Sequence, residues 1–407
     1  MTVITQAWGS GPTARYDALA APFRPIFARI RAGAPTRDTE RRLPHEELAW
    51  LRDAGFTTLR LPSRLGGSDA TLPELFALLI ELAAADSNVT NALRAHFGFT
   101  EDVLNAADAE YRERWLRRLA ERETVGSGFS ESGDAKVGTY ATRLVQQDDG
   151  TWLLNGRKFY TSGSLFADWI NLGAEDGDGG SVTALVPTRA PGVEILDDWN
   201  GFGQATSASG TAIFTDVRLP DDLVVPGAQR FRYSVAFFQL VHLSTLAGIG
   251  RAAADDAARL VSERKRIFSH GNAPRAGDDP QILQIVGRVR GAAYAAGAIA
   301  LKAAESVQRA YDARHDGDAA WAAAAAIADL EINQSVTVIT SLILDATTVL
   351  FDALGASSAR RELALDRYWR NARTIATHNP RVYRDRIVGD YAVNGTVPPG
   401  QYRVGEP

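Results

Sequence analysis

The spacing of hydrophobic residues changes twice along the 407-residue chain and divides it into three regions. From residue 12 to about residue 122, apolar residues recur every three or four positions, which predicts amphipathic helices. One of these helices has a well-marked start, because Thr71 followed by Glu74 matches the capping-box pattern. We therefore expect an N-terminal helical domain over residues 1–122.

The apolar spacing then shortens to two, and Tyr140–Leu144 alternates large apolar residues with small or polar ones. This alternation predicts β-strands, and Val182–Pro187 and Ala212–Val217 are further strand candidates. We interpret the Asn155-Gly156 pair as a turn between two strands. Short strands separated by segments rich in glycine and aspartate predict a central β-barrel domain over residues 123–228.

Helical spacing returns in the last part of the chain. Three long alanine-rich segments carry it: Val241–Phe268, Gln281–Arg314 and Ala319–Leu354. Arg360–Ala376 supplies a fourth helical segment. Four helices with short links predict a C-terminal four-helix bundle over residues 229–407. The expected fold class is therefore α+β multidomain, in the order helical domain, β-barrel and bundle.

Composition narrows the classes of function. The net charge is −5 and there is no basic block, so nucleic-acid binding has little support. The absence of cysteine excludes disulfides, thiolate nucleophiles and cysteine-bound metals. The six histidines form no paired metal-binding motif, so we expect no metal. Without a signal peptide or a long uncharged apolar run, we expect a cytoplasmic protein that does not bind membranes.

The stretch Asp366–Pro380 combines large aromatic residues, arginines and one histidine. Tyr368 and Trp369 supply side chains for burial, and His378 stands just before an Asn-Pro pair. Because proline restricts the backbone that precedes it, we expect His378 where a helix ends and a loop begins. On pattern alone, an amphipathic helix with a solvated arginine face and a surface histidine explains the stretch equally well.

The β region carries hydroxyl and aromatic side chains that suit a planar ligand. These residues are Phe129, Ser130, Tyr160, Thr161, Ser162, Trp199 and Ser209. Aromatic faces beside hydroxyl and backbone donors suit a heteroaromatic ring with a polar edge, and a flavin is such a ring. Polar strand ends around a core tryptophan explain the same residues equally well.

Four motifs carry a resemblance to a known family. They are Lys158–Gly163, Asp197–Gly203, Ser207–Thr211 and Trp369–Thr374, the last followed by His378. Over essentially the whole chain, the sequence resembles the acyl-CoA dehydrogenase superfamily. Within that superfamily it is most similar to the flavin-dependent monooxygenase branch, which includes dibenzothiophene monooxygenases and sulfur-acquisition oxidoreductases. The fourth motif is the most specific, because it is typical of this branch and not of the dehydrogenases.

The resemblance implies a homotetramer with an acyl-CoA dehydrogenase-like fold. It also implies reduced FMN, supplied by a separate NAD(P)H flavin reductase, with the FMN phosphate reached by a neighbouring subunit. Oxygen would add to the flavin as a C4a-hydroperoxide, which then oxygenates a small, weakly polar substrate. Organosulfur compounds are one candidate class of substrate.

The resemblance also implies roles for individual residues. His378 and Ser162 are expected near the reactive flavin, His96 on the substrate side and Ser127 in the peroxide pocket. A lone histidine such as His96 is more often a structural residue with satisfied hydrogen bonds than a catalytic one. The cofactor-binding set is completed by Arg266 at the phosphate, Ser357 at the position of a second phosphate arginine, and Arg373.

Two of these positions depart from the family pattern. Ser127 stands where relatives often have asparagine, and its side chain is a shorter donor. Ser357 stands where a phosphate-binding arginine is expected, although Arg360 and Arg361 lie close in the sequence. The second departure leaves FAD as an alternative to FMN.

A physical argument favours oxygenation over dehydrogenation. A dehydrogenase needs a carboxylate base within reach of the proton that it removes. The two segments expected to carry that base, His242–Thr245 and Thr377–Asn379, contain no glutamate or aspartate. An imidazole instead suits hydrogen bonding to a peroxide.

A dry pocket protects such a peroxide from water. The aromatic residues expected to line it are Phe97, Phe99, Phe129, Trp199, Phe237 and Phe238. Two alternatives stay open: an FAD-dependent acyl-CoA dehydrogenase or desaturase, and a non-catalytic flavin-binding scaffold.

Overall fold

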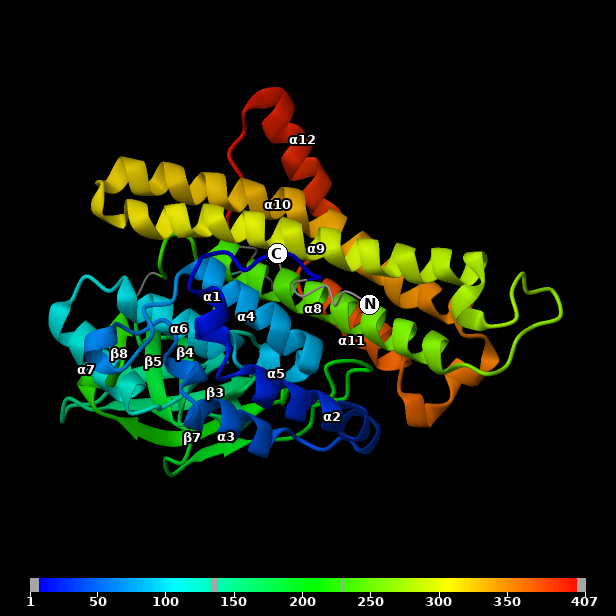
Figure 1. Ribbon diagram of the computed structural model, residues 1–407. Coiled ribbons are helices and arrows are strands. Elements are labelled where there is room, and N and C mark those ends of the chain that lie inside the picture. Colours follow the sequence, from blue (N-terminus) through cyan, green and yellow to red (C-terminus); the bar gives the residue numbers. More distant parts are fainter. Residues whose placement is uncertain (1–6, 133–137, 228–229, 401–407) are drawn as a thin grey trace.

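The computed structural model describes residues 7–132, 138–227 and 230–400. N-terminal helices come first, a β-sheet follows, and long helices complete the chain (Figure 1). This architecture confirms the predicted fold class. Two hydrophobic cores hold it together: one joins the N-terminal helices to the long helices, and the other fills the sheet and its flanking helices.

The N-terminal part consists mainly of helices, and one of them, over Leu72–Ala85, is almost completely buried. The helices are α1 (Tyr16–Ala20), α2 (Arg24–Glu40), α3 (His45–Asp53), α4 (Leu72–Ala85), α5 (Ser87–Ala92), α6 (Arg94–Leu104) and α7 (Ala109–Ala120). The predicted capping box starts α4: the backbone N–H of Thr71 donates to Glu74 at 2.8 Å, and that of Glu74 donates to the Thr71 hydroxyl at 3.3 Å. The buried leucines of α4 pack against the long helices, which fixes the N-terminal part on the bundle.

The central sheet has eight strands in the order β6-β7-β3-β2-β4-β5-β8, with β1 paired to β4. Its strands are β1 (Val125–Gly128), β2 (Arg143–Gln146), β3 (Trp152–Lys158), β4 (Trp169–Glu175), β5 (Ser181–Pro187), β6 (Val193–Ile195), β7 (Ala212–Leu219) and β8 (Val224–Pro226). Alternate residues of β3, such as Trp152 and Leu154, face the sheet core. The sheet forms a half-barrel whose parallel β1–β4 edge lies against α6.

The predicted turn at Asn155-Gly156 is wrong, because both residues lie inside β3. The pairing of β3 with β7 shifts register there. Gly156 has φ +149°, and a Cβ at this position would lie 2.7 Å from Thr142. Opposite, the side chain of Asn155 exchanges hydrogen bonds of 2.9 and 3.0 Å with Asp216. The Asn-Gly pair therefore forms a β-bulge instead of ending a strand.

The C-terminal part is built on three long helices. They are α8 (Ser234–Glu263), α9 (Pro280–Asp312) and α10 (Asp318–Val349), followed by the shorter α11 (Asp366–Ala376) and α12 (Arg384–Asn394). Buried alanines of α9, including Ala293 and Ala296, allow close approach to α8. The predicted fourth helix starts only at Asp366, after short 3₁₀ turns, and α12 was not predicted.

Two of the described helices, α8 and α10, are long and apolar enough to cross a membrane by length and composition. The most apolar window of α8 is 83% buried inside the protein and that of α10 is 44% buried. Core helices of a bundle meet the same criterion, so this is weak support for a membrane span. The expectation that the protein binds no membrane stays a prediction.

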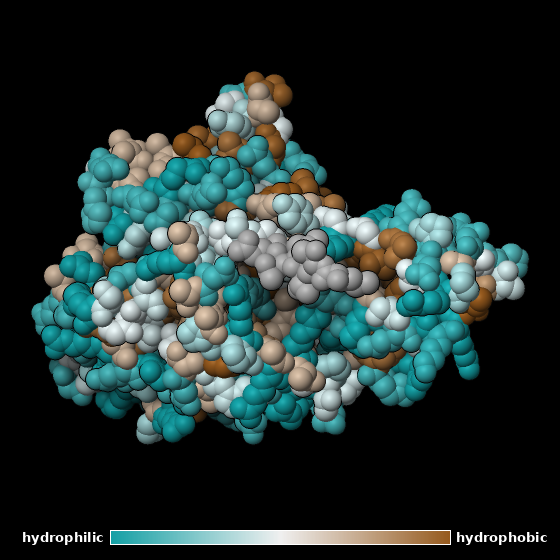
Figure 2. Space-filling view, viewed as in Figure 1, coloured by the Kyte–Doolittle hydropathy of each residue, from teal (hydrophilic) through white to brown (hydrophobic). Residues whose placement is uncertain are grey.

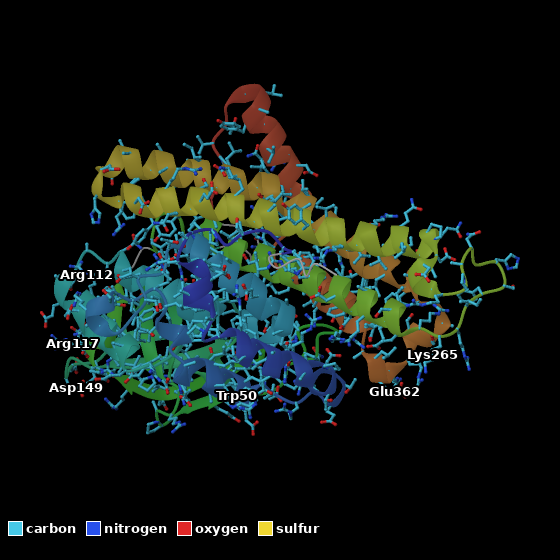
Figure 3. The ribbon with its side chains drawn as sticks, viewed as in Figure 1. Trp50, Arg112, Arg117, Asp149, Lys265 and Glu362 are labelled. Carbon is cyan, nitrogen blue, oxygen red and sulfur yellow. The ribbon has the colours of Figure 1, made fainter. Side chains whose placement is uncertain are left out.

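Several hydrophobic residues of the long helices remain exposed. Tyr391 and Val393 of α12 are 43% and 82% exposed, and Figure 2 shows a hydrophobic patch at the tip of this helix. Others are Leu283 and Tyr294 on α9 and Ile327 and Val338 on α10. The bundle also extends away from the sheet, since Lys265 and Glu362 lie at the opposite end of the molecule from Asp149 (Figure 3).

Helix α11 joins the bundle to the sheet and to α2. The buried side-chain oxygen of Asn371 accepts a hydrogen bond of 2.6 Å from the backbone N–H of Gln204. Arg370 forms an ion pair with Asp38 of α2. A Cβ at Gly203 would lie 2.1 Å from the Arg370 carbonyl oxygen, so only glycine allows this approach. The Trp-Arg-Asn part of the motif therefore docks α11 on the loop before β7.

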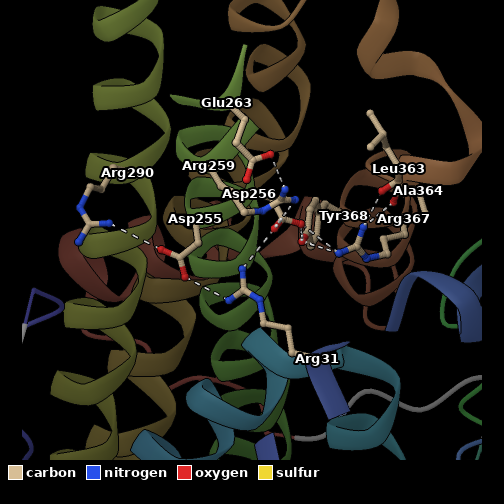
Figure 4. Close-up of polar contacts among 10 residues, drawn as sticks. All are labelled: Arg31, Asp255, Asp256, Arg259, Glu263, Arg290, Leu363, Ala364, Arg367 and Tyr368. Atoms are coloured by element: carbon tan, nitrogen blue, oxygen red, sulfur yellow. Dashed lines mark hydrogen bonds and ion pairs between the residues drawn. The ribbon is translucent and has the colours of Figure 1, made fainter. Parts of the chain in front are cut away.

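The opposite face of α11 is fixed by a network of charges (Figure 4). The Tyr368 hydroxyl donates to Asp256 of α8 at 2.5 Å, and Arg367 pairs with the same carboxylate at 3.3 Å. Arg31 of α2 reaches Asp256 at 3.5 Å. Arg367 is 7% exposed, so the predicted solvated arginine face is wrong at this residue.

The predicted burial of Trp369 is also wrong. This side chain is 40% exposed and stacks on Phe202, which is 58% exposed, with ring centroids 6.0 Å apart. The aromatic pair lies at the rim of the α11 junction and leaves the buried contacts to the neighbouring residues.

Replacing Asn371 with alanine is expected to destabilise the protein by about 1–3 kcal/mol, because the buried N–H of Gln204 loses its acceptor. Urea unfolding measures the loss. Asn394→Ala is the matched control, since it removes an exposed hydrogen bond to Asp390 on α12 and should change stability little. Equal stability of the two variants would show that the Asn371 contact does not hold α11 in place.

Candidate functional site

The turn after α11 brings His378 against His242 of α8. The two imidazole rings meet edge to face, with centroids 4.2 Å apart. His242 is 1% exposed, and neither of its ring nitrogens has a hydrogen-bond partner among the described residues. Asn379 fixes the turn by donating a hydrogen bond of 2.8 Å to Gln239 of α8. The predicted position of His378, at the junction of a helix and a loop, is confirmed.

Both rings are disposed to stay neutral near pH 7. Burial lowers the pKa of His242 well below its usual value, and the charges of His378 and Arg94 lower it further. In the single chain, His378 is exposed to solvent on average over the whole residue. Its imidazole ring packs on His242, and the loss of hydration there lowers its pKa. The positive charge of Arg94 lowers the same pKa further. No carboxylate contributes to either shift.

A line of side chains connects the histidines to the sheet. The guanidinium of Arg94, at the start of α6, lies 4.7 Å from the ring centre of Phe238 on α8. Arg230 lies 4.8 Å from the same ring and 4.2 Å from that of Phe129, which follows β1. Arg230 also pairs with Asp102 at 3.0 Å. We call these residues, with His242 and His378, the junction site.

Gly98 determines where Phe238 can lie. A Cβ at this glycine would lie 2.2 Å from the Phe238 ring, so a larger residue would push the ring out of place. Since Phe238 stacks against both Arg94 and Arg230, its position sets the spacing of the two guanidinium groups.

A chain of three hydroxyls runs along the sheet side. The Ser207 hydroxyl donates to the carbonyl oxygen of Gln204 at 2.8 Å, so it must accept from Ser209 at 2.7 Å. Ser209 has then used its single proton, and Ser162 must donate to it at 2.6 Å. The oxygen of Ser162 is therefore left as a hydrogen-bond acceptor for any further partner.

Aromatic residues lie beside this hydroxyl chain. The ring of Tyr160 lies 4.6 Å from that of Phe159 and 5.9 Å from that of Trp199. Tyr160 is 53% exposed and adopts φ +60°, an unusual value that marks local strain. Thr161 is buried and donates its hydroxyl proton to the Gly210 carbonyl at 2.9 Å, so it has no proton left for a ligand.

The other residues predicted on this side occupy different environments. Ser127 is half-buried on β1, where its backbone N–H donates to Ser164. Ser130 is exposed, and its carbonyl accepts from Phe159 at 3.0 Å. His96 is 2% exposed with Nε2 at 2.9 Å from the Thr57 carbonyl oxygen, and burial lowers its pKa. The geometry of His96 fits the structural interpretation better than contact with a substrate.

The predicted phosphate residues lie at the far end of the bundle. Arg266 and Ser357 are both exposed, and the neighbouring Arg264 donates to the Leu354 carbonyl at 2.6 Å, which holds the two segments together. Figure 3 shows Lys265 at this end, away from the sheet. One chain therefore does not bring Arg266 and Ser357 to the hydroxyl chain. Arg373 is half-buried on α11.

The prediction that six aromatic residues line a dry pocket is wrong for three of them. Phe97, Phe99 and Phe237 are at most 1% exposed and belong to the hydrophobic cores. Sequence reasoning also missed Arg94 and Arg230. The signal for Arg94 was available, because it is an arginine between apolar residues on a helix that is otherwise buried.

A well-defined cavity lies away from the junction site. It has a volume of about 630 Å³ and lies between the N-terminal segment, α2, α4 and α8, lined by residues such as Trp8, Tyr16 and Arg251. It contains no histidine, so we locate the candidate site at the junction. Within residues 7–132, 138–227 and 230–400, no cluster of histidine and acidic side chains could hold a metal ion.

Comparison with known proteins places this geometry in a family. The N-terminal, middle and C-terminal domain models of acyl-CoA dehydrogenases match residues 19–123, 128–217 and 240–381. A dibenzothiophene monooxygenase from Mycolicibacterium goodii is 28% identical over 368 residues, which cover 87% of this chain and 88% of the relative. A probable FMNH2-dependent monooxygenase from Pseudomonas putida is 25% identical and covers 92% and 94%.

A solved structure is similar over nearly the whole chain. FMN-bound TdsC from Paenibacillus sp. A11-2 superposes with a TM-score of 0.87 at 26% identity, covering 94% of this chain and 99% of its own. The protein therefore belongs to the acyl-CoA dehydrogenase superfamily, and these relatives, which match it over most of their length, are flavin-dependent monooxygenases.

Proposed function

We propose that this protein is a two-component flavin-dependent monooxygenase that uses reduced FMN and O2 to oxygenate a small substrate. The observation that carries the proposal is the charge composition of the junction site. Two neutral imidazoles lie in contact there, and no carboxylate acts on either of them. A dehydrogenase needs a carboxylate base at this place, whereas a neutral imidazole can donate a hydrogen bond to an oxygen species.

The residues on the sheet side fit a flavin. The free acceptor on Ser162 suits a ring N–H, and Phe159, Tyr160 and Trp199 supply aromatic surface beside it. FMN is the flavin bound by the similar Paenibacillus protein, and when bound it supplies the chemistry of oxygen activation. These contacts favour FMN as the cofactor, and the exposed Ser357 leaves FAD as the alternative.

His378 is the proposed hydrogen-bond donor of the site. Its ring lies against buried His242, which restricts the orientations open to it. Phe129 and Phe238 cover the two arginines with apolar surface and limit the access of water. A site with these properties suits a small, weakly polar substrate, and the relatives named above make organosulfur compounds a candidate class.

We further propose a homotetramer. The predicted phosphate residues, Arg266 and Ser357, lie at the end of the bundle away from the sheet, so a neighbouring chain is needed to complete one flavin site. Exposed hydrophobic residues on α9, α10 and α12 offer surfaces for that association. A separate NAD(P)H flavin reductase would supply reduced FMN, and a cytoplasmic location fits the absence of cysteine.

Rapid mixing with oxygen tests the oxygenase proposal. The protein is loaded anaerobically with reduced FMN and mixed with oxygenated buffer. We expect a transient absorbance that differs from the spectra of both reduced and oxidised flavin. Direct conversion from reduced to oxidised flavin at the rate of free FMN would count against an oxygenase, and anaerobic bleaching of bound FAD by an acyl-CoA would support a dehydrogenase.

His378→Asn is expected to lower product formation by about 10²-fold or more, because the shorter side chain withdraws the N–H donor from the reactive oxygen, and loss of one positioned donor costs on that order. Flavin oxidation should continue and yield hydrogen peroxide instead of product. Product and peroxide are quantified together. His315→Asn, at an exposed position of the α9–α10 turn, is the control and should keep the ratio of product to peroxide seen in the wild type.

Lowered histidine pKa values predict acid sensitivity. Below pH ~6.5 the unfolded chain protonates His242, whereas the folded chain resists, so stability falls as the pH drops. The slope contributed by one such group is at most about 1.4 kcal/mol per pH unit. In urea unfolding between pH 7.5 and 5, His242→Gln should show a shallower loss than the wild type or His315→Gln. Identical slopes in all three proteins would refute the buried, neutral state of His242.

A further inference from the structure

Arg94 is a partly buried cation whose terminal nitrogens have no hydrogen-bond partner among the described residues. Its Nε donates to the carbonyl oxygen of Phe238 at 3.3 Å, and its guanidinium lies on the Phe238 ring. Among residues 7–132, 138–227 and 230–400, no acceptor binds Nη1 or Nη2 and no carboxylate forms an ion pair with the group. Both nitrogens are free to bind a ligand.

The buried cations Arg37 and Arg60 show how such a charge is usually compensated. Arg37 pairs with Glu47 at 2.7 Å, and Arg60 pairs with Glu101 at 2.6 Å. Burying a charge without a partner is unfavourable, and proteins ordinarily avoid it. Arg94 is only partly buried, and no carboxylate of the described residues pairs with it.

The groups around Arg94 leave its positive charge uncompensated. Arg230 is already paired with Asp102, so that pair adds no net charge. His242 and His378 are disposed to be neutral. Burial and the charge of Arg230 lower the pKa of Arg94 to about 9, which still leaves it protonated at pH 7. The junction site therefore carries a net positive charge before any ligand binds.

We propose that the substrate is a small organic carboxylate whose two oxygens pair with the free nitrogens of Arg94. A guanidinium fork matches two-oxygen anions and binds them with two parallel hydrogen bonds. The apolar remainder of the substrate would lie against Phe238 and Phe129, which flank the arginines. This inference rests on the proposed function and changes the substrate class of the same site from a weakly polar molecule to an anion with an apolar remainder.

The position of Arg94 favours the substrate over the flavin as its partner. Arg94 lies on the helical side, on a ring of α8, and its charge acts on both histidines. The free hydroxyl oxygen that suits the flavin lies on the sheet, at Ser162. If Arg94 instead binds the flavin, its loss will weaken the binding of FMN and not that of an anion.

Calorimetry with matched probes tests the inference. Butanoate and butanamide differ in charge and little in shape, and benzoate and benzamide form a second pair. Each is titrated into the full-length protein, with and without oxidised FMN. For whichever of the two carboxylates binds more tightly, we expect the wild type to bind it at least about tenfold more tightly than the matching amide. Because no turnover is involved, the result stands even if the oxygenase proposal fails.

Arg94→Met should abolish the preference for the carboxylate and change FMN affinity less than about threefold. Arg94→Lys keeps the charge without the fork and should retain part of the preference. Arg314→Met is the matched control, because Arg314 also stacks on an aromatic ring, at 3.6 Å, and donates to the carbonyl of that residue, Tyr311. It should bind the probes as the wild type does.

Two results would overturn the inference. One is a wild type that binds neither carboxylate better than its amide. The other is a preference for the carboxylate that survives in Arg94→Met, whether or not that variant still binds FMN. If Arg94→Met does not fold, as circular dichroism would show, a full wild-type preference in a folded Arg94→Lys that lacks the fork would contradict the two-oxygen pairing.

Discussion

The close approach of α11 to the loop before β7 is the constraint on which the candidate site depends. Gly203 permits it, because any Cβ would collide with the Arg370 carbonyl oxygen. The buried bond from Gln204 to Asn371 then fixes the helix along its axis. His378 follows α11 by only a short turn, so its place beside His242 is set by contacts made two helical turns earlier.

The same loop connects this docking contact to the sheet side of the site. Gln204 gives its N–H to α11 and its carbonyl oxygen to the Ser207 hydroxyl. Through Ser209, that second bond determines that Ser162 is a hydrogen-bond acceptor. The backbone of Gln204 thus positions both the imidazole side and the hydroxyl side of the candidate site. The two sides are mechanically coupled although they belong to different parts of the fold.

Features with a local cause could be predicted from the sequence. The capping box at Thr71 involves residues three positions apart, and the long helices follow from their apolar spacing. The bulge at Asn155-Gly156 could not be predicted, because its glycine is required by Thr142 on a neighbouring strand. A local pattern that usually marks a turn was overridden by a tertiary contact.

The candidate site shows the same limit. The motif ending in His378 was recognisable, but the roles of its residues depend on partners far away in the sequence. Arg367 looked solvated until its carboxylate partner, Asp256 on α8, was in place. Arg94 is the opposite case, because an arginine on a mostly buried helix becomes informative only once the structure shows that no described carboxylate pairs with it. Sequence patterns identify such residues, and packing decides what they do.

A crystal structure of the protein with FMN bound tests the central claim most directly. The account predicts that the isoalloxazine ring lies between the Ser162 hydroxyl and the His378 imidazole, with Ser162 within hydrogen-bond distance of about 3 Å and the imidazole in contact with the ring. A flavin bound in the cavity near Trp8 and Arg251, or a His378 ring turned away from the flavin into solvent, would contradict it.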